Sequence, residues 1–360
     1  MQNFTRRQFI AMGAGGFVLL AGGGVLFQIF KDPTPRDLKI KPQDLPTNSA
    51  NATTLPQSDL AALPLPLWLT KNDEFYNVQY NGIPDVGLGT WSLTIHGLIR
   101  QPMRLSLEEI KALPALNTMH TLECIGNPTG GNLIGNAEWR GISLRDLLSR
   151  AGFAANARWV IIGGVDEYFT AIPLTRAMDD HALLAYEMNG APIPLKHGFP
   201  LRAILPGVYG QKQPKWITGI EISAEEKLGP WESQGWSRAA EIRINSAIRN
   251  PREGKILARG DILIAGVAHA SVAGVESVQV STDDGATWHD TILTRAPSPH
   301  VWTPWGYIWK NPAPGEYILS VRATDKAGAT QPPGKFSLLA DVFPNGSDTI
   351  HSIVVQVKAA

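Results

Sequence analysis

The apolar positions of this chain follow three different patterns along its length. The first covers residues 9–30, which are almost wholly apolar, interrupted only by small glycines and by Gln28, and which come just after Arg6 and Arg7. Paired arginines before a glycine-rich, moderately hydrophobic stretch are typical of a twin-arginine export signal. These 22 residues also suffice, as a helix, to cross the ~30 Å hydrocarbon layer of a bilayer. No Ala-x-Ala cleavage site ends the stretch.

We therefore expect residues 1–31 to be an export signal that is retained as a membrane anchor. Because the arginines stay in the cytoplasm, the chain after Lys31 is expected on the extracytoplasmic, periplasmic side of the cell membrane. Residues 32–62 are rich in Pro, Thr, Asn, Ser and Ala and show little periodicity. This composition predicts a flexible linker.

The second pattern, over residues 63–244, mixes the periods of helices and strands. Residues 106–113 begin with a Ser-x-x-Glu capping box, and residues 143–152 begin with serine and end with glycine, so both predict short helices. Short apolar runs predict strands, which we expect at residues 91–97, 121–124, 159–163 and 168–172. The mixture indicates an α+β domain with a mixed sheet.

The third pattern, over residues 245–360, consists of short alternating strands without a helical period. The strands are expected at residues 262–268, 274–281, 288–294, 317–325 and 352–357. They predict an immunoglobulin-like β-sandwich without an inter-sheet disulfide. The string Ser-Thr-Asp-Asp-Gly-Ala-Thr-Trp at 281–288 matches the Asp-box of sialidases, but a single copy is more typical of a hairpin turn.

Charge and cysteine content exclude several classes of protein. Lys and Arg number 32, as do Asp and Glu, so the formal net charge is zero, which argues against a nucleic-acid partner. The single cysteine, Cys124, excludes an intramolecular disulfide, a cysteine-based zinc or iron–sulfur site and a Cys-x-x-Cys-His haem attachment within this chain. On composition alone, a lone thiol is more often a buried, inert side chain than a ligand or nucleophile.

The sequence around Cys124 changes that interpretation. Four groups of residues occur in a fixed order: Thr-Leu-Glu-Cys-Ile-Gly-Asn at 121–127 with Asn-Ala-Glu-Trp-Arg-Gly at 136–141, Leu-Ala-Tyr-Glu-Met-Asn-Gly at 184–190, His-Gly-Phe-Pro-Leu-Arg at 197–202, and Leu-Pro-Gly at 205–207 with Lys-Trp-Ile at 215–217. Together they resemble the sulfite oxidase family of molybdenum enzymes over roughly residues 70–360. The resemblance implies a mixed α/β molybdopterin-binding domain followed by an immunoglobulin-like dimerisation domain.

The resemblance also implies a cofactor, molybdenum held by molybdopterin, and a set of residues that bind it. Cys124 corresponds to the metal ligand, and a thiolate is a soft donor that suits this metal. The implied cofactor-binding residues are His197, Arg202, Gln213, Lys215, Asp166 and, with a looser match that is nearer the methionine-sulfoxide-reductase branch, Tyr76 and Asn77. Taken alone, His197 is equally explained as a turn cap and Lys215 as a solvated strand end. The other histidines show no metal-ligand spacing.

Three departures from the sulfite oxidases bear on the substrate. Asn77 and Thr129 occupy positions where those enzymes have arginines, and Trp236 occupies the position of an active-site tyrosine. Charge-assisted hydrogen bonds contribute about 1.5–3 kcal/mol each, so the loss of two cations disfavours the sulfite dianion. The indole of Trp236 adds apolar surface, and we expect it to line a pocket for a less charged, bulkier substrate.

We therefore expect a molybdopterin oxidoreductase that performs two-electron oxygen-atom-transfer chemistry on a small molecule. Without a haem motif or a second cysteine, the chain must exchange electrons with an external donor or acceptor, such as a membrane haem protein, a quinone or a cytochrome. One alternative is a sulfoxide-type reductase on the same scaffold. Another is a membrane-tethered binding module without enzymatic activity. A homodimer through the sandwich is a further expectation.

Overall fold

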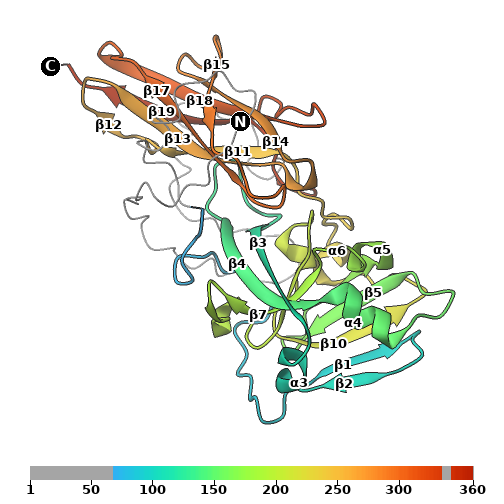
Figure 1. Cartoon of the computed structure of the whole chain (residues 1–360). Coiled ribbons are helices and arrows are strands. Elements are labelled where there is room, and N and C mark those ends of the chain that lie inside the picture. The colour runs from blue at the N-terminus through green and yellow to red at the C-terminus, as the bar shows by residue number, and fades with distance from the viewer. Residues whose placement is uncertain (1–67, 335–341, 360) are drawn as a thin grey trace.

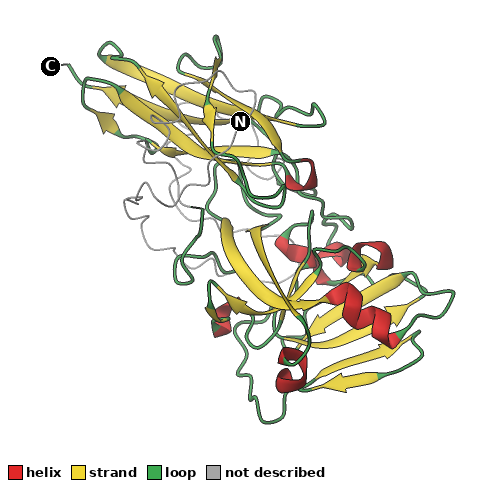
Figure 2. Ribbon diagram, viewed as in Figure 1, coloured by secondary structure: helices red, strands yellow, loops and turns green. Residues whose placement is uncertain are grey.

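The computed structural model describes residues 68–334 and 342–359. The expected signal, anchor and linker at residues 1–62 lie outside the described residues. Within the described part of the chain, no helix has both the length and the apolar character needed to cross a membrane. Figure 1 shows two lobes, the first coloured from blue to yellow and the second orange to red. Strands dominate both lobes, and the helices are short (Figure 2).

Two sheets form the first lobe. One is mixed, because β1 and β10 run parallel while its other neighbours are antiparallel. Its order is β2 (Met103–Leu105), β1 (Leu93–Gly97), β10 (Ile217–Ser223), β5 (Trp159–Gly164) and β6 (Phe169–Pro173). The other sheet is antiparallel, with the order β3 (Ala115–Glu123), β4 (Ile134–Ser143), β7 (Leu183–Met188) and β8 (Ala191–Pro192), and with β9 (Arg202–Ile204) paired to β7.

The helices of this lobe begin and end where local chemistry predicts. Helix α3 (Leu107–Lys111) starts at a complete capping box between Ser106 and Glu109. Helix α4 (Leu144–Ala151) starts at Ser143, whose side chain accepts from the amide of Asp146, and ends at Gly152, which has a φ of 64°. The remaining helical segments are single turns: α5 (Leu174–Ala177), α6 (Pro230–Ser233), η2 (Leu195–His197) and η3 (Gly210–Lys212).

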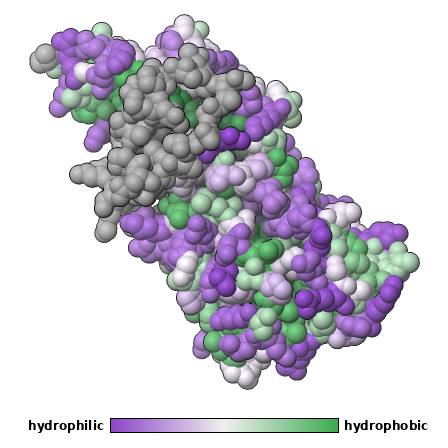
Figure 3. Space-filling model, in the orientation of Figure 1, coloured by the Kyte–Doolittle hydropathy of each residue, from purple (hydrophilic) through white to green (hydrophobic). Residues whose placement is uncertain are grey.

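The main core of the first lobe lies between its sheets and α4. Alternate residues of β1, β5 and β10 are fully buried there together with one face of α4, including Leu93, Ile95, Leu148, Ile162 and Ile220. Buried residues alternate along these strands because successive side chains point to opposite faces, and they recur every three or four residues in α4 because one face of the helix packs on the sheets. Hydrophilic residues cover much of the visible face of the molecule (Figure 3).

The second lobe is a sandwich of two sheets. One has the order β11 (Asn245–Asn250), β13 (Ile262–His269), β17 (Thr303–Trp309) and β16 (Ile292–Leu293). The other has the order β12 (Ile256–Leu257), β19 (His351–Val357), β18 (Gly315–Asp325), β14 (Val275–Ser281) and β15 (His289–Asp290). A core around Trp305 and Leu319 lies between them. The predicted fold class, a mixed α/β domain followed by a β-sandwich, is confirmed.

One predicted strand of the sandwich is in fact two. Residues 288–294 form β15, which pairs with β14, and β16, which pairs with β17 in the opposite sheet. Thr291 lies buried between them, and both its amide and its hydroxyl donate to the carbonyl oxygen of Val278, at 3.0 and 2.9 Å. These two bonds turn the chain from one sheet to the other, which a residue pattern of period two cannot reveal.

The two lobes meet along the ends of β3 and β4. Ile134 packs against Val267, Val301 and Trp302 of the sandwich. Beside this cluster the amide of Thr121 donates to the carbonyl oxygen of His300 at 2.9 Å, and the amide of Trp302 donates to the Thr121 hydroxyl at 2.9 Å. The lobe interface therefore lies within a few residues of Cys124.

A buried ion pair joins η3 to α6. The ammonium of Lys212 contacts the carboxylate of Glu232 and also donates to the Thr170 hydroxyl and the Ala171 carbonyl, both at 3.0 Å. We expect Lys212→Met to lower the free energy of unfolding by about 3–5 kcal/mol, because the carboxylate is left buried without its cation. Urea denaturation will measure the change.

The controls for this prediction are a compensated pair and an exposed pair. Lys212→Met combined with Glu232→Leu removes both charges and should recover most of the loss. Lys227→Met breaks the exposed pair with Glu221 and should cost under about 1 kcal/mol. A loss in Lys212→Met no larger than in Lys227→Met would contradict the prediction.

Imidazoles at the lobe interface make stability depend on pH. Burial, and then the nearby His181, lower the pKa of His300 to about 4. In the unfolded chain this histidine takes up a proton near pH 6.5, while folded His300 stays neutral down to about pH 4. Protonation therefore favours the unfolded state, and the free energy of unfolding falls as the pH drops from 6.5 to 4. We expect the free energy of unfolding, measured with urea from pH 7.5 to 5, to fall less steeply in His300→Gln. The exposed His96→Gln should keep the wild-type slope.

Candidate functional site

Cys124 lies at the end of β3 and opens the loop that returns the chain to β4. Its amide donates to the carbonyl oxygen of Leu133, and its carbonyl oxygen accepts from the amide of Asn127, both at 2.9 Å. Cys124 forms no disulfide, and part of the residue is exposed while its thiol lies largely within the protein. Burial raises its pKa to about 11, with the amide of Gly126 acting in the opposite direction. At neutral pH the thiol therefore keeps its proton unless a bound cation displaces it.

Gly126 leaves space between Cys124 and Trp236. A β-carbon placed on Gly126 would lie 3.8 Å from Sγ of Cys124 and 4.0 Å from Cη2 of Trp236. Trp236 comes just after α6 and also makes an edge contact with Phe343, with ring centroids 5.2 Å apart. Phe343 is a sandwich-side residue with 45% of its surface exposed. The indole predicted to line the substrate pocket thus lies near the sulfur, with a second aromatic ring beside it.

Two cations lie side by side behind Gly198. Nη1 of Arg202 donates to the His197 carbonyl at 2.8 Å, and Nζ of Lys215 donates to Oδ1 of Asn77 at 2.8 Å. A β-carbon on Gly198, whose φ is 115°, would lie 3.0 Å from the β-carbons of both Arg202 and Lys215. Only glycine allows the two side chains to flank the backbone this closely.

The charges of Arg202 and Lys215 are not balanced by a carboxylate. Burial lowers the pKa of Arg202 to about 10, and burial together with the neighbouring Arg202 lowers the pKa of Lys215 well below its usual value. Among the described residues, no carboxylate oxygen lies within 4.0 Å of either group, and Nε of Arg202 is buried without a hydrogen-bond partner. Aromatic rings lie beside both cations, Trp139 beside Arg202 and Trp216 beside Lys215. Such a pair fits an anionic group, as the phosphate of a pterin cofactor would be.

His197 takes part in the site as a neutral ring. Its Nε2 lies 2.7 Å from the carbonyl oxygen of Asn72, and because a carbonyl only accepts, Nε2 carries the proton and Nδ1 is an acceptor. Burial lowers the pKa of His197 to about 3. The ring can therefore accept one hydrogen bond from a ligand at Nδ1, and it contributes no positive charge.

Three further predicted residues lie around the same group. Tyr76 is close enough to Cys124 and Arg202 for their charges to act on its hydroxyl, whose pKa burial raises well above the usual value. Asn77 holds Lys215, as described. Asp166 accepts from the amide of Tyr168 at 3.3 Å, and burial raises the pKa of its carboxyl while Lys215 acts in the opposite direction. A hydrogen bond therefore connects Asn77 to the cation pair, and electrostatic interactions connect Tyr76 and Asp166 to the cysteine or to that pair.

Gln213 differs from the other predicted residues. Its Oε1 accepts from the amide of Leu205 at 3.0 Å, and its Nε2 donates to the carbonyl oxygen of Val208 at 2.8 Å. Both ends of the amide are thus used to hold the 205–208 turn. Gln213 shapes the wall of the site through backbone bonds, and its side chain is not presented to a ligand.

The sequence analysis missed two aromatic residues that lie close to Arg202 and to Cys124. Trp139 lies under Arg202, with its ring centroid 4.9 Å from the guanidinium carbon. Tyr168 donates to the carbonyl oxygen of Gln211 at 2.5 Å and lies near enough to Cys124 for the two to interact electrostatically. Trp139 stands within the Asn-Ala-Glu-Trp-Arg-Gly string, so a signal for it was available. Tyr168 has the pattern of an ordinary strand residue and gave none.

Comparisons with known proteins agree with this geometry. Residues 80–231 match the family model for the oxidoreductase molybdopterin binding domain. The chain is 32% identical to mitochondrial sulfite oxidase of Mus musculus over 271 residues, which are 63% of this chain and 49% of that protein. It is 31% identical to sulfite oxidase of Arabidopsis thaliana over 280 residues, 64% of this chain and 71% of the plant protein. The chain thus spans about half the length of the mouse relative and most of the plant one.

A solved structure shares the whole fold. The crystal structure of the sulfane dehydrogenase SoxCD from Paracoccus pantotrophus superposes with a TM-score of 0.72 at 23% identity, covering 93% of this chain and 96% of that one. At this identity the likeness establishes the fold alone. The family model and the identity to the plant enzyme over most of its length agree: this chain belongs to the sulfite oxidase family of molybdopterin-dependent oxidoreductases.

Proposed function

We propose that the chain is an extracytoplasmic oxidoreductase in which Cys124 binds molybdenum and the neighbouring cations bind the pterin. The observation that carries the proposal is the position of Tyr76, whose hydroxyl lies within electrostatic reach of both the free thiol of Cys124 and the guanidinium of Arg202. Arg202 and its neighbour Lys215 have no carboxylate within ion-pair distance among the described residues. When bound, the cofactor supplies two-electron oxygen-atom transfer. Side chains of this chain bind and orient the cofactor and line the substrate pocket.

The roles of these side chains follow from their chemistry. Arg202, with its unpartnered Nε, and Lys215 take the phosphate, since both are buried donors with positive charge. His197 offers Nδ1 as an acceptor, and Asp166 offers a carboxylate to the amino group of the pterin. Tyr76 and Asn77 close the site from the segment before β1.

The substrate in this proposal carries less charge than sulfite. The Thr129 hydroxyl is bound to Ser347 and Thr349, and Asn77 is bound to Lys215, so neither position adds a cation near the sulfur. Trp236 and Phe343 instead present aromatic surface. Such a surface favours an organic group on the substrate and gains about 25 cal/mol for each Å² of apolar area removed from water.

Electrons in this proposal pass to or from another molecule, because the chain has one cysteine and no haem attachment motif. Residues 1–31 act as an export signal and anchor that keep the enzyme at the periplasmic face of the membrane. A membrane haem protein, a quinone or a cytochrome is then within reach. The sandwich is the proposed surface for a homodimer.

A second candidate function is the reduction of sulfoxides. The aromatic surface at Trp236 and Phe343 suits a neutral sulfoxide as well as it suits a neutral thioether. The two functions differ in the direction of electron flow. Reduced viologen is consumed by a reductase, and ferricyanide is consumed by an oxidase.

The cofactor assignment predicts a distinct loss for each of two variants. Cys124→Ser should lose most of its molybdenum, because the hydroxyl is a harder donor than the thiolate. Arg202→Met should lose both molybdenum and pterin, because the phosphate loses its buried partner. Elemental analysis and pterin fluorescence of folded protein from a cofactor-competent host will measure both. Arg238→Met, which removes an exposed cation paired with Glu226, should keep both groups. A folded wild type without metal or pterin would overturn the assignment.

The substrate assignment predicts a selective effect at Trp236. The wild type should show a kcat/KM at least about 10-fold higher for a neutral aryl methyl sulfoxide or thioether than for sulfite. Trp236→Ala should lower kcat/KM for the neutral compound by about 10-fold or more, because a buried aromatic contact contributes about 1.5–3 kcal/mol. Trp288→Ala, in the sandwich beside Arg322, is the matched control and should change neither rate. Faster turnover of sulfite by the wild type would refute the assignment.

A further inference from the structure

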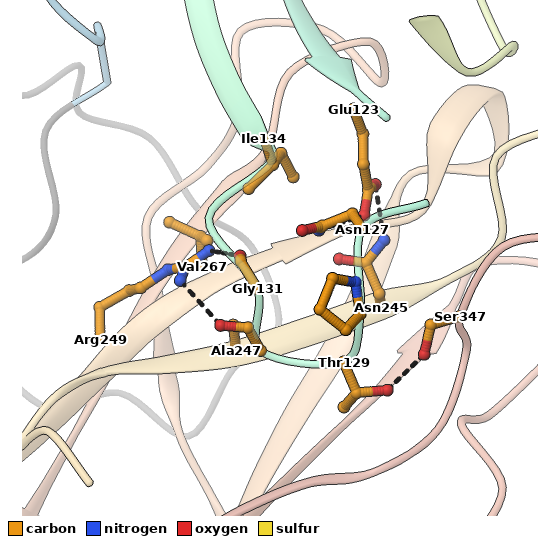
Figure 4. Close-up of a pocket in the computed structure, with 12 residues that line it drawn as sticks. Glu123, Asn127, Thr129, Gly131, Ile134, Asn245, Ala247, Arg249, Val267 and Ser347 are labelled. Atoms are coloured by element: carbon orange, nitrogen blue, oxygen red, sulfur yellow. Dashed lines mark hydrogen bonds between the residues drawn. The ribbon is translucent and has the colours of Figure 1, made fainter. Parts of the chain in front are cut away.

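The loop that carries Cys124 is held from the other lobe. Arg249, on β11 of the sandwich, donates three hydrogen bonds to it: Nη1 to the Gly130 carbonyl at 3.1 Å and to Oδ1 of Asn132 at 2.8 Å, and Nη2 to the Gly131 carbonyl at 2.9 Å. Figure 4 shows the guanidinium reaching the loop beside Gly131. Two successive carbonyl groups that the loop itself leaves unbonded are satisfied by one planar side chain.

A second group of sandwich residues holds the same loop from its other side. The Thr129 hydroxyl is hydrogen-bonded to that of Ser347 (Figure 4). It is also hydrogen-bonded to the hydroxyl of Thr349 at 2.6 Å. The ring of His351 packs directly on Gly130, which has a φ of 75° and no room for a β-carbon. Nδ1 of His351 in turn accepts from the amide of Ile248 at 3.0 Å, which fixes the ring.

A third connection reaches the residue next to the cysteine. Asn245 of β11 donates to Oε2 of Glu123 at 2.8 Å, and Asn127 donates to Oε1 of the same carboxylate at 2.9 Å. Oδ1 of Asn127 then accepts from the amide of Leu133 at 2.9 Å. Glu123, immediately before Cys124, is thereby fixed by one residue of the sandwich and one of the loop.

We propose that Arg249 is a positioning residue for the metal ligand: by binding the carbonyls of Gly130 and Gly131, it sets the loop conformation that presents the sulfur of Cys124. The inference rests on the proposed function only in taking Cys124 as the ligand. The sandwich then completes the cofactor site of the first lobe, in addition to any role in assembly. Burial lowers the pKa of Arg249 to about 10, so the guanidinium is charged at neutral pH.

The test uses the full chain prepared without cofactor, where Cys124 is the only thiol. In Arg249→Gln, we expect the rate of thiol modification by a disulfide reagent to rise about 10-fold or more, and amide hydrogen exchange of residues 125–133 to speed up, because the loop loses its three bonds. Arg249→Lys should recover part of the protection. Arg322→Gln is the matched control, since that guanidinium binds Gln279 within the sandwich.

The same variants are then prepared with cofactor. Arg249→Gln should shift the absorption of the metal–thiolate centre and lower kcat more than KM, whereas Arg322→Gln should leave both unchanged. If Arg249→Gln fails to fold, Thr129→Val removes only the hydroxyl contacts and should raise thiol reactivity in the same direction. A folded variant with wild-type thiol reactivity and wild-type exchange in the loop would overturn the inference. Faster exchange in a protein that never binds molybdenum would support the hold of Arg249 on the loop of Cys124, but it would refute the proposed function and with it the role of Cys124 as metal ligand.

Discussion

Two buried cations without a carboxylate partner are the constraint on which the first lobe depends. Removing charges such as those of Arg202 and Lys215 from water costs several kcal/mol each. Carbonyls, the amide of Asn77 and two aromatic rings offset part of this cost, and the more distant carboxyl of Asp166 acts on Lys215 in the same direction. An anionic ligand completes the compensation, so binding energy for the cofactor is stored in the fold before the cofactor arrives. Gly198 makes the arrangement possible, because a side chain there would separate the two cations.

The sequence was sufficient for features that depend on neighbouring residues. The capping box at Ser106, the terminal glycine at Gly152 and the apolar run of β5 are local patterns, and each produces the expected element. The candidate site was predicted through family resemblance. His197, Arg202 and Lys215 stand in short sequence strings, near η2 and β9, that carry this resemblance. Gln213 stands there too, yet its amide serves the backbone. Proximity in sequence did not reveal the direction of its side chain.

Features that depend on distant residues could not be predicted in this way. The division of residues 288–294 between two sheets is caused by the bonds of Thr291 to Val278, thirteen residues away. The hydrogen bonds from Arg249 to the carbonyls of Gly130 and Gly131 join residues more than a hundred positions apart. In the sequence Arg249 has the pattern of an ordinary edge residue in a β-strand, since neither spacing nor charge marks the loop to which it binds.

Thr129 connects the choice of substrate to the architecture. At this position the resemblance to sulfite oxidases predicts an arginine, whose guanidinium would add positive charge near the sulfur. Threonine carries no charge, and its hydroxyl is hydrogen-bonded to Ser347 and Thr349 of the sandwich. In the proposed function, one residue therefore both leaves out a cation that the sulfite oxidases have and fixes the loop. Restoring arginine here would add attraction for an anion but break the contact between the lobes, so charge and loop geometry at this position cannot be changed independently.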